Sequence, residues 1–519
     1  MAYKRLEITR PKGIITDLSP YELPNEAWSS GNNVNFRNFR TNREIGYSQV
    51  FPDLSIQPLF ALSSSISNVG NWFYGSTTDI YKTNGTTQTN ITRETGAVDV
   101  PYTGTFVDGW TGDVFNGVAV MNNTTDAPQY YDTVTGKMKE LTGWPTDYSA
   151  AVVRPFKNYL IALNITDDSG ENIPSLVRWS NGAPVGSVPA DWDSVNPASQ
   201  AGENSLADSG GVIIDGRALS NTFMIYKSDS VWGMQFIGGS FTFSFRKIFS
   251  DQGALSSDCI TEFEGKHFVV APSDVYVHDG TSKNSIITNK IKKELFSRIN
   301  ESFVNRVKCV ADTPNKEVWI YYPSTDSASG LCDKALVWNW ETNDWSPRDL
   351  ENIAHIAVGD INPVESDTWD GSPAGSWNDD TSAWGEGSYN PSQTELLLSN
   401  YTDSKFFQAN LSTTLDGLAY SSFVERTGLD FQDDLNYKYV NSITPHLLGE
   451  GTVNITVGSE DRQGQGILWS QPVVFEIDAD YKADFRVSGR YISIRIESNT
   501  STSWSLTGYT VEYKEVGER

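Results

Sequence analysis

The chain has 519 residues, 12% of them aromatic and 20% charged, and its 65 Asp and Glu residues outnumber its 39 Lys and Arg residues to give a net charge of −26. This length suggests about three domains, and the Gly and aromatic content is typical of an all-β chain. The acidic balance argues against a surface that grips the phosphates of nucleic acid, although it leaves open that nucleic acid passes nearby without being held.

The first predicted element is an N-terminal docking segment, residues 1–55. It contains a short alternating strand at 31–37 but too little apolar sequence for a core of its own, so we expect it to dock on a partner surface. Its candidate interaction residues are Trp28, Phe36 and Arg37.

Residues 56–360 carry a repeated pattern of β-hairpins, in which aromatic and β-branched strands end in turns with Gly, Asn or Asp. The clearest pairs are 71–75 with 80–85, 117–122 with 129–136, 267–271 with 275–280, and 317–322 with 335–340. Their spacing of roughly 40–50 residues is that of β-propeller blades, and six or seven blades fit the pattern equally. Within this region only 288–299 predicts a helix, with Ile291, Leu295 and Ile299 on one face.

Residues 361–392 differ from the rest and predict a linker or an inserted hairpin arm rich in Trp and Asp. Trp369, Trp377 and Trp384 either anchor local packing or form a contact surface, because Trp is enriched at interface hot spots. The acids of this arm lack the register of a calcium-binding loop, and weak calcium binding there stays an alternative. Residues 393–519 alternate again, notably at 453–458 and 491–497, and predict a β-sandwich.

Residues with catalytic or ligand-binding spacing are not found, so we expect no enzyme activity, no cofactor and no metal. Phosphate-binding loops, zinc-protease helices and nucleophile elbows are missing from the sequence. A sialidase-type repeat has only one poor approximation, at 459–469, and with 65 acids the presence of a carboxylate pair discriminates nothing. The four histidines, which have no metal-ligand spacing, are His267, His278, His355 and His446.

Cellular location is constrained by two further features. Cys259, Cys309 and Cys332 are odd in number and far apart, which favours buried reduced thiols over disulfides or a zinc cluster. The N-terminus lacks the apolar core of a signal peptide, and no apolar run is long enough to predict a transmembrane helix.

A series of motifs runs through residues 10–350. In chain order they are Gly13-Ile14-Ile15-Thr16-Asp17-Leu18 with Leu23-Pro24 and Ala27-Trp28, Asn33 to Arg37, Arg178-Trp179-Ser180-Asn181 with Asp191-Trp192-Asp193, Ile225 to Trp232 with Phe236 to Gly239, and Lys316 to Pro323 with Leu336 to Trp340 and Trp345-Ser346. By their number and order, these motifs resemble the tail nozzle proteins of short-tailed bacteriophages, also called tail tubular protein B or packaged-DNA stabilisation protein.

The resemblance implies a structural virion protein, made in the host cytoplasm, that forms a hexameric ring at the distal end of the tail. It further implies contacts with a tail adaptor or gatekeeper ring and with tail fibres or a needle, and a channel that retains the genome and then passes it. Contact with the host cell surface also belongs to this expectation. Two alternatives stay open: a tail fibre or receptor-binding protein that recognises host glycan, and a glycan-active propeller enzyme.

Overall fold

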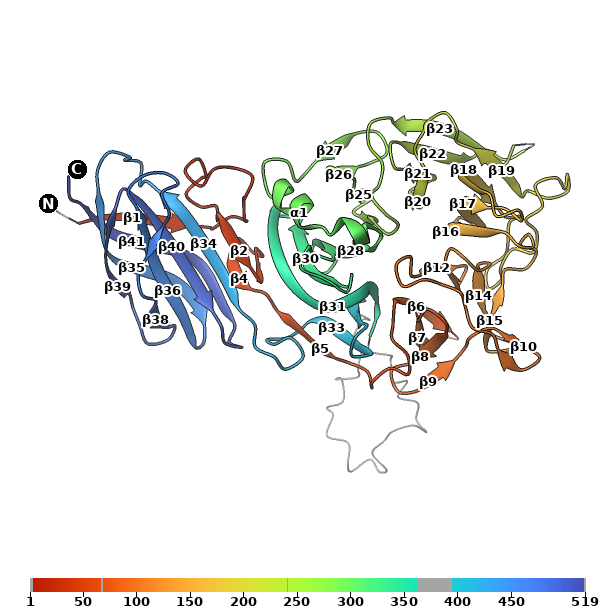
Figure 1. Cartoon of the computed structure of the whole chain (residues 1–519), viewed down its shortest axis with the longest axis horizontal. Helices are drawn as coiled ribbons and strands as arrows, with labels where there is room; N and C mark the ends of the chain where they lie inside the picture. The colour runs from red at the N-terminus through yellow and green to blue at the C-terminus, as the bar shows by residue number, and fades with distance from the viewer. Residues whose placement is uncertain (1–2, 67–68, 240, 362–393, 518–519) are drawn as a thin grey trace, which may run out of the picture. The chain divides into compact units, whose positions relative to one another are not determined.

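The computed structural model describes residues 3–66, 69–239, 241–361 and 394–517, and over these ranges the protein is all-β, as the sequence predicts (Figure 1). The chain divides into two compact units. Unit 1 comprises Met1–Gln49, Ala207–Ile353 and Ala409–Arg519, and unit 2 comprises Val50–Leu206 and Ala354–Gln408. The division differs from the boundaries predicted at 55, 360 and 392, because each unit is assembled from separate stretches of chain.

Unit 2 contains three four-stranded antiparallel sheets whose strands follow chain order, which is the construction of a propeller blade. The first has β6 (Phe60–Ile66), β7 (Val69–Gly75), β8 (Ile80–Thr83) and β9 (Gln88–Asn90). The second has β12 (Thr111–Phe115), β13 (Val118–Asn122), β14 (Gln129–Asp132) and β15 (Lys137–Glu140). The third has β16 (Ser149–Phe156), β17 (Tyr159–Thr166), β18 (Asn172–Trp179) and β19 (Gly202–Ser205), and a short ribbon pairs β10 (Glu94–Thr95) with β11 (Val98–Asp99).

Unit 1 contains two further sheets of the same kind. One has β20 (Ile213–Leu219), β21 (Thr222–Lys227), β22 (Val231–Phe236) and β23 (Phe243–Phe249), and the other has β24 (Ile260–Phe263), β25 (Lys266–Val270), β26 (Val275–His278) and β27 (Lys283–Ser285). Helix α1 (Lys292–Arg298) and the 3-10 helix η1 (Glu301–Arg306) follow. The helix is shorter than the predicted 288–299, but Ile291, Leu295 and Ile299 are buried together as expected.

Local turn chemistry explains why the predicted hairpins form. Asn116 and Gly117 join β12 to β13 with φ of 52° and 85°, and such a pair of positive φ values matches the twist of a tight hairpin. The predicted pairs are observed as β7 with β8, β13 with β14, β25 with β26, and β29 with β30. Apolar side chains from adjacent sheets then share cores; Phe115, Val120, Val153 and Leu160 belong to one such cluster in unit 2.

A seven-stranded sheet ends the series, in the order β28-β29-β30-β31-β32-β33-β5. Its strands are β28 (Lys308–Asp312), β29 (Glu317–Tyr322), β30 (Cys332–Asn339), β31 (Asp344–Asp360), β32 (Thr394–Asn400), β33 (Lys405–Ser412) and β5 (Gly46–Gln49). We expected residues from 393 onward to begin the sandwich. The structure instead places β32 and β33 in this sheet, where they lie between β31 and β5.

The C-terminal strands form a β-sandwich, as predicted, but residues near the N-terminus complete both of its sheets. One sheet has the order β3-β4-β41-β35-β39 with β1 beside β41, and the other has the order β2-β34-β40-β36-β37 with β38 beside β36. Their bounds are β1 (Lys4–Thr9), β2 (Ser30–Asn32), β3 (Val34–Asn35), β4 (Thr41–Arg43), β34 (Ser422–Leu429), β35 (Lys438–Gly449), β36 (Thr452–Glu460), β37 (Leu468–Trp469), β38 (Val473–Glu476), β39 (Ala483–Gly489), β40 (Tyr491–Ser498) and β41 (Trp504–Glu515). Alternating apolar residues of the two sheets, such as Ile443, Ile494 and Val511, meet in one core.

The N-terminal segment therefore docks on its own chain, which corrects the expectation that it needs a partner surface. Strand β1 pairs with β41 from Lys4 opposite Tyr513 to Thr9 opposite Gly508, and β2 pairs with β34. The carboxylate of Asp17 accepts hydrogen bonds from the backbone N–H groups of Lys292 and Lys293, and so caps helix α1. Segments far apart in sequence supply the apolar surface that this segment lacks.

Candidate functional site

Two of the predicted interaction residues are interior residues. Trp28 is 1% exposed, its indole N–H donates to Thr41 Oγ1 at 3.1 Å, and its ring lies 5.9 Å from that of Tyr509. Phe36 is 3% exposed and belongs to the same core. We expected both side chains at a docking surface; the structure shows them inside unit 1, where they hold the N-terminal segment to the sandwich.

Arg37 also has its binding partner within the same chain. Its guanidinium donates two hydrogen bonds of 2.7 Å to the carboxylate of Glu317 on β29. Burial lowers the pKa of Arg37, but the hydrogen bonds and attraction of Glu317 outweigh burial and raise it overall. Burial raises the pKa of Glu317. Two parallel hydrogen bonds between a guanidinium and a carboxylate are nevertheless the geometry of a charged pair, and we therefore assign Glu317 as ionised and paired with Arg37. Arg37 therefore acts as a buried structural ion pair.

A second buried pair extends this ionic cluster. Arg348 lies 3.2 Å from the Glu44 carboxylate, donates to the carbonyl of Ile45 at 2.7 Å, and stacks its guanidinium 4.2 Å above the Trp319 ring. Burial raises the pKa of the nearby Asp312, whose carboxylate accepts from Asn410. We missed this cluster in the sequence, where the only signal was a charged residue, Glu317, beginning an otherwise apolar strand.

The remaining candidates, Trp369, Trp377 and Trp384, lie outside the described residues. Among the residues that the structure does describe, no group of three or more His, Cys, Asp or Glu side chains is placed to hold a metal ion. Within the same ranges, no helix is both long and apolar enough to cross a membrane. The three cysteines are buried free thiols.

Two of the histidines form a buried chain of hydrogen bonds through Tyr226. The Tyr226 hydroxyl lies 2.6 Å from His267 Nδ1 and 2.7 Å from His278 Nε2. His267 Nε2 faces the carbonyl of Ala218 at 2.9 Å, and His278 Nδ1 accepts from the N–H of Gly280. Burial lowers the pKa of His267 to about 3 and that of His278 to about 4, so both rings are neutral at pH 7. All three side chains are almost wholly buried, and their polar atoms are satisfied by one another, which indicates a structural role.

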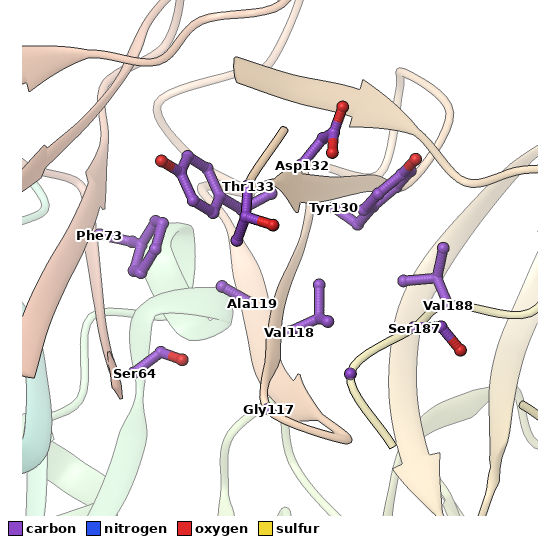
Figure 2. A pocket seen from close by; sticks show the side chains of 12 residues that line it. Ser64, Phe73, Gly117, Val118, Ala119, Tyr130, Asp132, Thr133, Ser187 and Val188 are labelled. Atoms are coloured by element: carbon purple, nitrogen blue, oxygen red, sulfur yellow. The ribbon is translucent and has the colours of Figure 1, made fainter. Parts of the chain in front are cut away.

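Unit 2 contains a cleft of about 300 Å³ (Figure 2). Its lining comes from β6, β7, the β12–β13 turn, β13, β14 and the loop at 186–188. Figure 2 shows Phe73 and Tyr130 on opposite sides, with Val118 and Ala119 between them. Hydroxyl groups of Ser64, Thr133 and Ser187 complete the lining. An aromatic wall with scattered hydroxyls is a surface that small polar organic ligands can use.

Asp132 is the acidic residue of this lining, and it is already paired. The ammonium of Lys139 lies 2.6 Å from its carboxylate, which also accepts from Val134 N–H and the Thr135 hydroxyl. The Lys139 contact is the main reason that the pKa of Asp132 falls to about 2. A carboxylate held ionised cannot donate a proton near neutral pH, so Asp132 is not suited to act as a general acid.

The residues that carry the tail-nozzle resemblance are mostly packing residues. Trp192 is fully buried and meets Trp144 edge to face at 4.8 Å, while the Trp179 indole donates to the carbonyl of Gln200. Trp338 and Trp345 lie together in the core of unit 1. These tryptophans contribute to the packing of the sheets, whereas Phe236 and Ile237 of the same motif set are exposed.

Comparisons with known proteins give only distant likenesses. No protein-family model matches the chain, and no curated protein sequence matches it significantly. Among solved structures, the chain is similar to the AfRom2 CNH domain, at 7% identity and a TM-score of 0.36 over 70% of this chain and 97% of that one. It is also similar to the extracellular domain of the hybrid two-component system BT3049 of B. thetaiotaomicron, at 8% identity and a TM-score of 0.38 over 84% of this chain and 49% of that one.

Proposed function

We propose that the protein is a structural virion protein that forms the distal nozzle ring of a short-tailed phage tail, and that it is not an enzyme. The observation that carries this proposal is the ordered set of sequence motifs over residues 10–350. The motif at 225–232 falls on the β21–β22 hairpin, and those at 316–323 and 336–340 fall on β29 and β30. Motifs that fall on successive blade-like strands and contribute buried tryptophans such as Trp192 and Trp345 fit an architectural part better than they fit a catalytic one.

The charge of the chain supports a channel role. DNA must move through such a channel without being bound tightly. Each Lys or Arg contact to a phosphate adds affinity and so slows the movement of the DNA. A net charge of −26 suits a ring that surrounds the genome without holding it. In this proposal six copies form the ring, and the genome passes through its centre.

The ring attaches through the sandwich, in this proposal, with the blade-like sheets toward the distal end. The N-terminal and C-terminal segments are parts of the same sandwich. Its partners are a tail adaptor or gatekeeper ring, with tail fibres or a needle nearby and the host surface beyond.

The decisive experiment is mass photometry and negative-stain microscopy of the purified protein, alone and with the neighbouring tail proteins. A six-fold ring with a central hole, bound to an adaptor ring, is the expected result. A stable monomer that binds isolated glycan and ignores the tail proteins would contradict the nozzle assignment.

The cleft in Figure 2 favours one second candidate, a tail fibre or receptor-binding protein that recognises host glycan. A sugar ring presents C–H groups that pack on the negative face of an aromatic ring, while its hydroxyls bond to side chains such as Thr133 and Ser187. Tyr130→Ala should then abolish binding to a panel of isolated bacterial lipopolysaccharides. Tyr481→Ala, which removes a tyrosine that is 81% exposed on the sandwich, is the matched control and should bind normally. Equal glycan binding by both variants would exclude the cleft as the glycan-binding site.

A further inference from the structure

The turn between β22 and β23 presents large apolar side chains to solvent. Ile237 is 57% exposed and Phe241 is 77% exposed, and Phe236 beside them is 40% exposed. The turn is closed by a hydrogen bond of 3.1 Å from Ile237 N–H to the carbonyl of Thr242, and Phe236 pairs with Phe243 across the hairpin. The ladder therefore holds the apolar tip outward, since it fixes the backbone on both sides of the turn.

Charge is distributed along this hairpin in an unusual way for so acidic a chain. Between Asp229 and Asp251 the sequence has no acid, and its only charged residues are Arg246 and Lys247. Both cations are exposed on β23, and Lys247 lies 5.1 Å above the ring of Trp232. The hairpin is thus an apolar tip followed by two adjacent cations.

The spacing of these two parts matches the two zones of a membrane surface. Arg246 lies three positions after Phe243, which begins β23 at the tip end, and this distance is about 10 Å of extended strand. Peripheral proteins bury apolar groups about 5–10 Å into the boundary between headgroups and acyl chains, and cations then lie near the lipid phosphates. Because neighbouring strand residues face opposite sides, Arg246 and Lys247 can contact phosphates on both sides of the hairpin.

We propose that the β22–β23 hairpin docks on an anionic phospholipid bilayer, with Ile237 and Phe241 in the interface and Arg246 and Lys247 on the phosphates. The chain as a whole, at −26, is repelled by such a surface. Screening limits that repulsion to about 8 Å at physiological salt, so the local charge of the hairpin decides whether it can approach. A protein partner would satisfy the apolar tip but would not by itself account for an acid-free hairpin with cations behind it. This proposal does not depend on the nozzle function.

Flotation of the full chain with vesicles tests the proposal. Vesicles of phosphatidylglycerol and phosphatidylethanolamine should bind the protein, and vesicles of phosphatidylcholine alone should bind it at least tenfold more weakly. The double variant Ile237→Ser/Phe241→Ser should lose more than tenfold in affinity for the anionic vesicles. The double variant Arg246→Gln/Lys247→Gln should lose about tenfold and most of the salt dependence, because each cation near an anionic surface contributes several-fold.

The matched control is Leu468→Ser, which removes an equally exposed apolar side chain from the sandwich and should leave binding unchanged. Thermal unfolding of every variant should match the parent, since the altered positions are exposed. The proposal is overturned if the parent does not bind anionic vesicles, or if the Ile237→Ser/Phe241→Ser variant binds them as well as the parent does. It is also overturned if the Ile237→Ser/Phe241→Ser variant keeps vesicle binding but loses self-association. That result would assign the tip to contacts between copies of the chain.

Discussion

Tyr226 shows how single residues in this protein acquire fixed roles through burial. The Ala218 carbonyl can only accept a hydrogen bond, so His267 Nε2 donates to it and His267 Nδ1 accepts from the Tyr226 hydroxyl. Gly280 N–H donates to His278 Nδ1, so His278 Nε2 donates to the same hydroxyl. Each donor in the chain has one acceptor, and removing any member leaves two buried groups without partners.

Tyr226→Phe is therefore expected to destabilise the protein by about 2–4 kcal/mol, because His267 Nδ1 and His278 Nε2 each lose a partner inside the core. Chemical denaturation at neutral pH measures the effect. Tyr481→Phe, at an exposed tyrosine, serves as control and should change stability by less than about 0.5 kcal/mol. Equal stability of the two variants would show that water replaces the lost partner.

Acid should weaken the protein through the same histidines. The unfolded chain binds protons at histidine below about pH 6.5, whereas burial lowers the pKa of His267 to about 3 and of His278 to about 4 in the folded chain. Between these values the unfolded state holds more protons, so stability falls with falling pH by up to about 1.4 kcal/mol per pH unit for each histidine. Denaturation between pH 7 and pH 5 should therefore show a smaller drop in His278→Asn than in the parent.

At the scale of elements, the N-terminal segment is held to unit 1 by packing and by buried charge. Strands β1 to β4 complete the sandwich sheets, and Trp28 fills the space between them. The Arg37–Glu317 pair links the end of this segment to β29. A truncation of residues 1–40 should therefore expose the sandwich core and cause aggregation.

Trp28→Ala should cost roughly 3–5 kcal/mol of stability, as large aromatic truncations in cores do. Thermal or chemical unfolding measures the loss. Phe39→Ala removes an aromatic side chain of the same segment that is 64% exposed, and should be nearly neutral. If Trp28→Ala were neutral as well, the segment would not be an integral part of the sandwich.

Arg37→Met should destabilise the protein by about 3–5 kcal/mol, because it leaves the buried Glu317 carboxylate without its partner. Adding Glu317→Gln should restore part of the loss, since the unpaired charge is then gone. Lys316→Met breaks the neighbouring exposed pair with Glu341 and should cost at most about 1 kcal/mol. Independent, additive losses in the double variant would argue against a charged pair.

At the scale of the whole molecule, the acidic charge should prevent retention of DNA. Non-specific affinity for DNA comes from cations that neutralise phosphate, and this chain has 65 acids against 39 basic residues. Fluorescence anisotropy with duplex DNA at physiological salt should therefore detect no binding by the purified protein. Binding that weakens steeply with added salt would reveal a basic path and contradict a channel that does not hold its genome.

Local sequence patterns predicted most of the elements correctly. Strand alternation and turn residues such as Asn116 and Gly117 act between neighbours in the chain, so the hairpins, the short helix and the sandwich strands were all accessible from sequence. The same reasoning treated Trp28, Phe36 and Arg37 as surface residues, because a short segment with few apolar residues gives no local sign of what will cover it.

The sequence by itself determined the all-β class, the repeated hairpins and the acidic charge, because these depend on residue type and on contacts between near neighbours. Only the tertiary structure decided that β1 pairs with β41, that β32 and β33 extend the sheet of β28, and that Glu317 meets Arg37. Those contacts join residues far apart in the sequence. They depend on which buried surfaces fit one another. Every strand shows the same alternation of apolar and polar residues, so this pattern does not identify which strand pairs with which.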